Sequence, residues 1–274
     1  MASQFEAFGD MERRAWADPT CATAYVDRFA AITDQAVATL SDAVGAAPGV
    51  RVLDLCCGQG TATAHLVTLG CDTVGVDFSA TMLEQAKRRM PHGDLRQGDA
   101  QALDFPDGSF DAVVSNFGLC HVPDQARALA EVRRVLVPGG QFAMTVWSPP
   151  TPDSAFGLIA GAVRSHGENT VSLPPEPGFH RLADREIAER ELAAAGFRQI
   201  ALRQIPCAWT LEDPEDLFTT FRDGTVRMAH LLSQQPAARR EAIRRAMTDA
   251  IRERFSDGPV WRVPQPASLV TATA

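Results

Sequence analysis

The first half of the chain alternates short apolar runs with turns and helical patterns. Five apolar runs predict strands, and three stretches with apolar residues at helical spacing lie between them. The expected strands are Arg51–Leu55, Thr73–Val76, Leu95–Gln97, Phe110–Ser115 and Gln141–Val146, and the expected helices are Thr61–Leu69, Ser79–Arg89 and Asp124–Val135. This alternation is typical of parallel βαβ units, so we expect an α/β fold built on a doubly wound, mostly parallel sheet.

The flanking segments add further helices and two strand candidates. Helical patterns are expected at Cys21–Val44, Ser154–His166, Asp184–Ala195 and Glu215–Phe255, and strands at Arg198–Thr210 and Ala267–Ala274. Gly196 follows one helix in the position of a C-terminal cap. The two added strands bring the expected Rossmann-like sheet to seven.

Changes in composition and hydrophobic pattern along the chain divide it into four parts. We expect an N-terminal helical cap at 1–48, a ligand-binding core at 49–150, an inserted cap at 151–183, and the rest of the sheet at 184–274 with a helical insertion at about 212–258. The proline-rich stretches Ser148–Asp153 and Pro174–Gly178 support the third part as an insertion.

Composition narrows the function classes. The chain has 26 Lys and Arg against 34 Asp and Glu, a formal net charge of -8, and its one Arg-dense stretch (239–254) is interleaved with acids at helical spacing. Nucleic acid is therefore not expected as a partner.

The start is acidic without an apolar core, and apolar runs of 18 residues are absent from the sequence, so we expect a soluble, cytoplasmic protein without integral membrane contact. The six cysteines include no C-x-x-C pair, so we expect reduced thiols and no metal site.

A glycine turn follows the first strand and is the strongest local signal. Gly58 and Gly60 allow a ligand to approach main-chain N–H groups at the start of the next helix. Asp77 ends the second strand, seventeen positions past Gly60, where a carboxylate can accept both hydroxyls of a ribose. Nicotinamide dinucleotides use a similar glycine turn and acid, so this pair alone leaves two interpretations open.

Three features favour a cationic amino-acid nucleoside over a dinucleotide. Thr63 stands where the third glycine of G-x-G-x-x-G would be. Asp54 precedes the turn, where a diphosphate would be repelled and an ammonium attracted, and Asp99 follows the third strand.

At this point the sequence resembles the class I S-adenosylmethionine-dependent methyltransferases, from about Val50 to Val146. Five segments carry the resemblance in the expected order: Leu53–Gly60, Gly75–Ser79, Gly98–Ala100, Phe105–Asp111 and Val135–Gly140. The subgroup it is most similar to includes ubiquinone and menaquinone C-methyltransferases and many small-molecule enzymes. The resemblance implies S-adenosylmethionine as cofactor, S-adenosylhomocysteine as product, and in-line methyl transfer to a small-molecule acceptor. A non-catalytic S-adenosylmethionine-binding module and an NAD-dependent oxidoreductase remain as alternatives.

The resemblance also implies a role for each candidate binding residue. The backbone of Gly58 and Gly60 would line the methionine part, and Asp54 would reach its ammonium directly or through water. The other expected contacts are Asp77 with the ribose, Phe78 with the face of adenine, Asp99 with the adenine amino group, the N–H of Ala100 with the ring, and Asn116 with the ammonium end through main-chain carbonyls or its amide.

Candidates for the acceptor side are fewer. His121 lies in the segment that leaves the fourth strand toward the expected acceptor side, which makes it the candidate general base. Tyr25 and His180 lie in segments expected to fold over the pocket, and Trp147, Trp209 and Trp261 are candidates for an apolar wall, although core packing explains such residues equally well. The sequence leaves open the acceptor, the methylated atom and the oligomeric state, a homodimer included.

Overall fold

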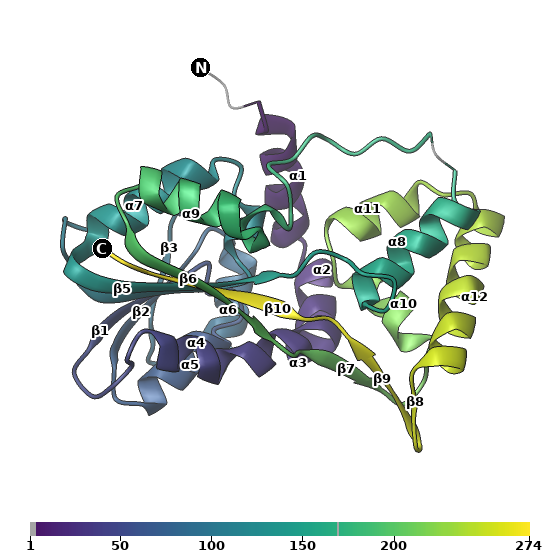
Figure 1. Cartoon of the computed structure of the whole chain (residues 1–274), viewed down its shortest axis with the longest axis horizontal. Helices are drawn as coiled ribbons and strands as arrows, with labels where there is room; N and C mark the ends of the chain where they lie inside the picture. The colour runs from purple at the N-terminus through teal and green to yellow at the C-terminus, as the bar shows by residue number, and fades with distance from the viewer. Residues whose placement is uncertain (1–3, 169) are drawn as a thin grey trace.

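The computed structural model describes residues 4–168 and 170–274, and its centre is a seven-stranded sheet (Figure 1). The strand order is β3-β2-β1-β4-β5-β10-β6. Strands β1 to β5 run parallel, whereas β10 is antiparallel to both of its neighbours, β5 and β6. The expected doubly wound, mostly parallel sheet of seven strands is confirmed. The strands are β1 (Arg51–Leu55), β2 (Asp72–Asp77), β3 (Asp94–Gln97), β4 (Phe110–Asn116), β5 (Leu136–Trp147), β6 (Arg198–Ile205) and β10 (Ala267–Thr273).

Helices cover both faces of the sheet, because alternate residues of each strand point to opposite sides. Val52 of β1 packs in the core that faces α4 (Val37–Ala43) and α5 (Thr61–Thr68), while its neighbour Leu53 packs in the core beneath α7 (Gln125–Val135) and α9 (Arg185–Ala194). A strand buried on both faces reads as a continuous apolar run, which is why the sequence pattern identified these strands.

Side-chain caps set where several helices begin. Ser79 accepts a hydrogen bond from the N–H of Met82 at the start of α6 (Ala80–Arg89), Asp124 caps α7, and Asp184 caps α9. A cap residue lies outside the helix proper, so each of these helices begins one residue after the predicted start.

The N-terminal segment is helical from an earlier point than predicted. Helix α1 (Glu6–Ala17) precedes a continuous helical stretch of α2 (Pro19–Ala24), one π-helical turn at Tyr25–Phe29, α3 (Ala30–Thr33), a 3₁₀ turn at Asp34–Ala36, and α4. The sequence pattern predicted this second stretch but not α1, whose buried face includes a glutamate, Glu12.

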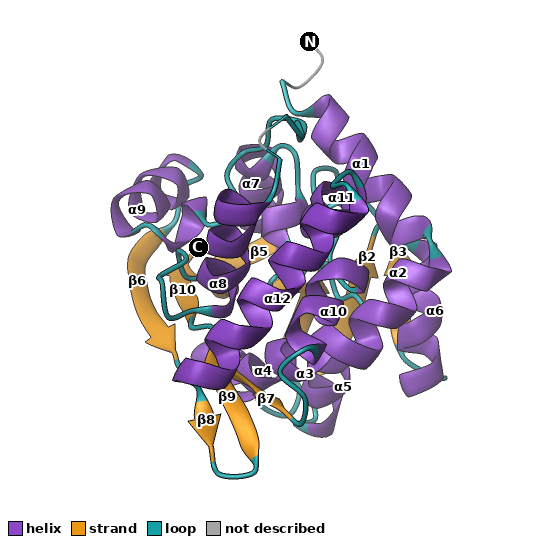
Figure 2. Ribbon diagram, turned by 90° about the vertical axis from the view of Figure 1, so that its right-hand side faces the viewer, coloured by secondary structure: helices purple, strands orange, loops and turns teal. Residues whose placement is uncertain are grey.

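A second lobe lies beside the sheet and is formed by segments after β5. It contains α8 (Ala155–His166), α10 (Asp216–Asp223), α11 (Arg227–Ser233) and α12 (Ala237–Arg254), seen at the right of Figure 1 and facing the viewer in Figure 2. A small antiparallel sheet, β7 (Ala208–Leu211), β9 (Val260–Pro264) and β8 (Ser256–Asp257), connects the lobe to the main sheet. The predicted single strand Arg198–Thr210 is therefore two strands in two sheets, β6 and β7.

Among the described residues, no helix is both long enough and apolar enough to cross a bilayer.

We expect the sheet core to carry much of the stability. Leu53 is fully buried on β1, so Leu53→Ala should lower the free energy of unfolding by about 2–5 kcal/mol. Urea denaturation followed by circular dichroism measures this. Val67, exposed on α5, provides the control, and Val67→Ala should change stability by less than about 0.5 kcal/mol. Equal effects of the two substitutions would contradict this packing.

Candidate functional site

The glycine turn joins β1 to α5 at the carboxyl edge of the sheet. Its backbone is left-handed at Cys56 (φ +59°), Gly58 (φ +55°) and Gly60 (φ +77°). Gly58 lines a cavity at this edge. Gly60 does not: an added Cβ there would lie 3.0 Å from the Cβ of Ala86 on α6, so Gly60 serves the packing of α6 against the turn. The sequence analysis predicted that both glycines would line the ligand, but the structure places only Gly58 at the cavity.

Asp77, at the end of β2, holds the turn in place. One carboxylate oxygen accepts the N–H of Gly58 at 2.9 Å and the other accepts the N–H of Ser79 at 2.8 Å. The side chain is buried, and burial raises the pKa of the carboxyl group although both hydrogen bonds oppose the shift. Each oxygen has a second lone pair, so the carboxylate that orders the turn can still accept hydroxyl groups from a ligand in the cavity.

Asp54 is a fully buried acid beneath the turn, and it tests whether a cationic ligand fits. Its Oδ2 accepts the hydroxyl of Thr63 at 2.6 Å, while its Oδ1 has no hydrogen-bond partner among the residues that the structure describes. Burial raises the pKa of this carboxyl group to about 7. A buried oxygen without a partner is costly unless a ligand donates to it, so the ammonium group of an amino acid suits this position. Thr63, which replaces the third glycine, is the residue that orients this acid.

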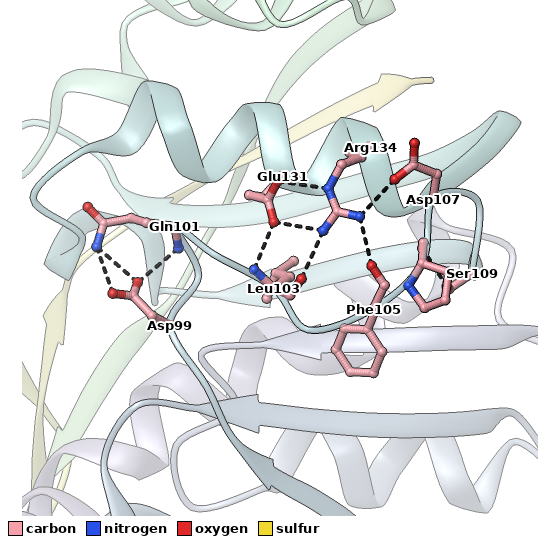
Figure 3. Close-up of polar contacts among 9 residues, drawn as sticks. Asp99, Gln101, Leu103, Phe105, Asp107, Ser109, Glu131 and Arg134 are labelled. Carbon is pink, nitrogen blue, oxygen red and sulfur yellow. Dashed lines mark hydrogen bonds and ion pairs between the residues drawn. The ribbon is translucent and has the colours of Figure 1, made fainter.

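The loop after β3 brings Asp99 and Ala100 to the same cavity. Asp99 accepts hydrogen bonds from the backbone and side-chain amide of Gln101, at 2.9 Å in both cases (Figure 3). Farther along the loop, Arg134 of α7 donates to the carbonyl oxygens of Leu103 (2.9 Å) and Phe105 (2.7 Å). This clamp ties the connection between β3 and β4 to α7.

A carboxylate of the same helix completes the clamp. Glu131 accepts both the guanidinium of Arg134, at 2.8 Å, and the N–H of Leu103, at 2.7 Å. The pairing with Arg134 lowers the pKa of Glu131. The arrangement fixes the loop that follows Asp99 without using any cavity-lining side chain, which leaves the face toward the cavity available to a ligand.

Two further predicted residues lie at the cavity in different ways. Phe78 is half-buried and lines it. Asn116 also lines it, but its amide is engaged elsewhere: Nδ2 donates to the carbonyl of Thr33 at 3.1 Å, and Oδ1 accepts the hydroxyl of Thr145 at 2.7 Å. The amide therefore holds the N-terminal segment to β5.

We call this hollow the cofactor cavity. It brings together the following predicted residues: Asp54, Gly58, Asp77, Phe78, Asp99, Ala100, Asn116 and His121. Helix α1 adds four residues that the sequence analysis did not identify: Gly9, Glu12, Arg13 and Trp16. They approach the cavity only through tertiary packing, since the hydroxyl of Ser79 donates to the carbonyl of Trp16 at 2.6 Å.

A second hollow, the aromatic cavity, adjoins the first and has a volume of about 580 Å³. Its aromatic walls are Trp16, Tyr25, Phe29, Phe117, Trp147, Phe156 and Phe179, with His121 and His180 among them. Both hollows are lined by Glu12, Trp16, Tyr25, Thr33, Phe117 and His121, so they meet there. Among the suggested wall residues Trp147 lines the cavity, whereas Trp209 packs in the core and Trp261 against it.

The two imidazoles of the aromatic cavity have opposite electrostatic surroundings. Burial alone would lower the pKa of His121, but Cys120 and Glu12 together raise it well above the ordinary value. Burial lowers the pKa of His180, whose Nδ1 lies 2.9 Å from the carbonyl oxygen of Trp147. A carbonyl only accepts, so His180 donates from Nδ1 and presents Nε2 as an acceptor.

A family model and curated relatives of this chain are methyltransferases. A family model described as a methyltransferase domain matches residues 53–144. A demethylmenaquinone methyltransferase of Renibacterium salmoninarum is 50% identical over 110 residues, 40% of this chain and 46% of that protein, so the match spans about half of that relative's length. Another, from Paenarthrobacter aurescens, is 43% identical over 175 residues, 60% of this chain and 68% of that protein.

A solved structure extends the likeness to the fold. Phosphoethanolamine N-methyltransferase 2 of Haemonchus contortus, in complex with S-adenosyl-L-methionine, aligns with a TM-score of 0.55 at 18% identity, covering 97% of this chain and 59% of that one. At this identity the likeness shows a shared fold.

We expect Asp54 to make stability depend on pH. Because its folded pKa of about 7 lies above the ordinary 3.8, the folded chain keeps a proton that the unfolded chain loses, and stability falls as pH rises from about 4 to 7. The neutral Asp54→Asn variant lacks this loss, so at pH 8 its melting temperature without ligand should exceed that of the wild type by at least about 2 °C, and at pH 4 the two should agree. Exposed Asp72 on β2 is the control, and Asp72→Asn should follow the wild type at both pH values. Parallel pH curves for Asp54→Asn and the wild type would contradict a buried, protonated acid.

Proposed function

The chain belongs to the class I S-adenosylmethionine-dependent methyltransferases, in the subgroup that includes the menaquinone enzymes, and we propose that it transfers the methyl group to a small apolar acceptor. One observation carries the proposal. A cavity with a glycine turn and four carboxylates shares lining residues, His121 among them, with a cavity walled by aromatic side chains. A donor and an acceptor bound in the two cavities would meet at this junction.

We propose that the cofactor cavity binds S-adenosylmethionine through residues of the chain's first half. Asp54 would hold the ammonium through its unpartnered Oδ1, together with the main-chain carbonyl of Asn116. Asp77 would accept the ribose hydroxyls, and Phe78 and Asp99 would contact adenine. Bound there, S-adenosylmethionine supplies an electrophilic methyl group on a sulfonium centre.

The aromatic cavity suits an acceptor with a planar apolar part. Its volume of about 580 Å³ lies within the range typical of small-molecule sites. Aromatic walls bind planar groups by burial and by stacked or edge-to-face contacts. The ring of Phe179 lies edge-on to His121, with 5.7 Å between centroids, so an acceptor against Phe179 would lie beside that imidazole.

We propose His121 as the group that takes a proton from the acceptor. Its Nδ1 lies 2.9 Å from Oε2 of Glu12, which leaves Nε2 as the basic nitrogen. A hydroxyl or an activated carbon needs such a base, whereas an amine needs only orientation. Demethylmenaquinone, named for the relatives, is the first acceptor to test.

We also propose a cytoplasmic location, a reducing environment and no nucleic-acid partner. The six cysteines are free, and the net charge of -8 would disfavour a polyanion. We further propose that the chain divides into a cap (1–48), a core (49–150), an inserted cap (151–183) and a remainder (184–274).

Binding of S-adenosylhomocysteine tests the cofactor. We expect micromolar affinity for the wild type by calorimetry, no binding of NAD, and an affinity reduced about 10- to 100-fold in Asp77→Ala, because hydrogen bonds to a charged group are lost. Asp72→Ala, at the exposed start of the same strand, should bind like the wild type. A preference for NAD would favour an oxidoreductase and refute the proposal. If S-adenosylmethionine binds but keeps its methyl group when acceptors are added, the result would favour a non-catalytic binding module.

The aromatic cavity is tested with 1-naphthol, a planar aromatic alcohol. Its binding, followed by fluorescence, should weaken at least about fivefold in Phe179→Ala, since apolar contact area is removed. Val67→Ala, at a distant exposed position, should leave the affinity unchanged. Equal affinities in all three proteins would show that the acceptor site lies elsewhere.

A further inference from the structure

A buried glutamate from α1 faces the candidate base across the junction of the two cavities. Glu12 is 2% exposed, and its Oε2 lies 2.9 Å from Nδ1 of His121. The same oxygen accepts the indole N–H of Trp16 at 2.9 Å. The three side chains thus form one contact between the N-terminal cap and the loop that follows β4.

The carboxylate of Glu12 sets the donor and acceptor roles in this contact. A carboxylate only accepts, and its Oε2 accepts the indole N–H of Trp16. Nδ1 of His121, bonded to the same carboxylate oxygen, is the donor, and the lone pair of neutral imidazole is on Nε2. When Nε2 gains a proton, the carboxylate stabilises the imidazolium, as the acid of a catalytic triad does for its histidine.

The other groups that face His121 support this arrangement or do not alter it. Besides Glu12 they are Cys120, the preceding residue, Cys21 on α2 and Asp77 at the end of β2. Burial raises the pKa of the Cys21 thiol. Glu12 bonds to Nδ1 of the imidazole at 2.9 Å. Cys120 also forms a side-chain hydrogen bond with the imidazole, and both contacts raise the pKa of His121.

We propose that Glu12 is a positioning residue for His121. It fixes the Nδ1-protonated tautomer, so that the docking of α1 completes the proton-accepting group. This inference rests on the proposed role of His121 in methyl transfer.

The seating of α1 is secured at its carboxyl end by the start of α6. The hydroxyl of Ser79 donates to the carbonyl of Trp16 at 2.6 Å, and that of Thr81 to the carbonyl of Ala17 at 3.0 Å. Glu12 lies one helical turn before Trp16 on the same buried face. Contacts beside the cofactor cavity therefore place the carboxylate that orients the base.

The tautomer and the pKa of His121 test the proposal without any acceptor. Long-range ¹H–¹⁵N spectra of the histidine rings, assigned with His121→Gln, should show a proton on Nδ1 of neutral His121. In Glu12→Gln its pKa should fall by about one to three units, because the opposite charge is removed. Glu6→Gln removes a charge from the exposed side of the same helix and should leave the His121 signals unchanged.

The outcomes separate this inference from the proposed function. A proton on Nε2 of neutral His121 in the wild type, which requires no variant, would overturn the inference, as would an unchanged pKa in folded Glu12→Gln. Failure of the wild type to bind S-adenosylhomocysteine would instead refute the proposed function. With an acceptor in hand, Glu12→Gln should lower kcat at unchanged KM and shift the acidic limb of the pH profile to lower pH, since activity requires neutral His121.

Discussion

The buried carboxylate of Asp77 is the interaction on which the architecture of the site depends. It accepts one N–H from the glycine turn and one from the start of α6, so a single side chain joins three elements at the carboxyl edge of the sheet. Burying a carboxylate is costly, and the two N–H groups offset part of that cost. Ser79, held by this carboxylate, in turn seats the end of α1, so the order imposed at β2 extends to Glu12 and His121.

The acidic side chains of the site are of two kinds, which differ in whether the protein itself supplies their hydrogen-bond donors. Buried Asp77 and partly buried Glu131 accept hydrogen bonds from donors of the protein itself, and they fix the loops around the cofactor cavity. Asp54 retains an unpartnered oxygen, which is tolerable because its carboxyl group holds a proton up to about pH 7. The first kind orders the scaffold, and the second leaves a position that a cation can fill.

Sequence reasoning succeeded where structure depends on local pattern. The bounds of β1 follow from its apolar run, and α6 and α7 begin within one residue of their predicted starts because Ser79 and Asp124 cap them through bonds within one turn. Asp54, Asp77 and Asp99 were found because parallel strands end at one edge, where acids after different strands converge. The resemblance to methyltransferases then implied S-adenosylmethionine as the ligand that these acids would bind.

What the sequence missed depends on contacts between distant segments. Glu12 on an otherwise apolar helix face looks like a solvent-facing residue until His121, 109 positions away, is packed against it. Gly60 matches a binding motif, yet the close approach of Ala86 gives it a packing role. The break between β6 and β7 falls at Pro206, a residue that interrupts strands and that the prediction of one strand passed over. That the two halves belong to different sheets follows from pairing with β10 and β9.

The placement of β10 has a consequence for how the chain assembles. This strand lies between β5 and β6, although both precede it by many residues. Until residues 267–273 have been synthesised, β6 has no partner in the main sheet and β5 presents an open edge. Unpaired edges are templates for association between chains. Nascent protein is therefore exposed to aggregation until its last central strand is in place, and slow translation of the second lobe would lengthen that period.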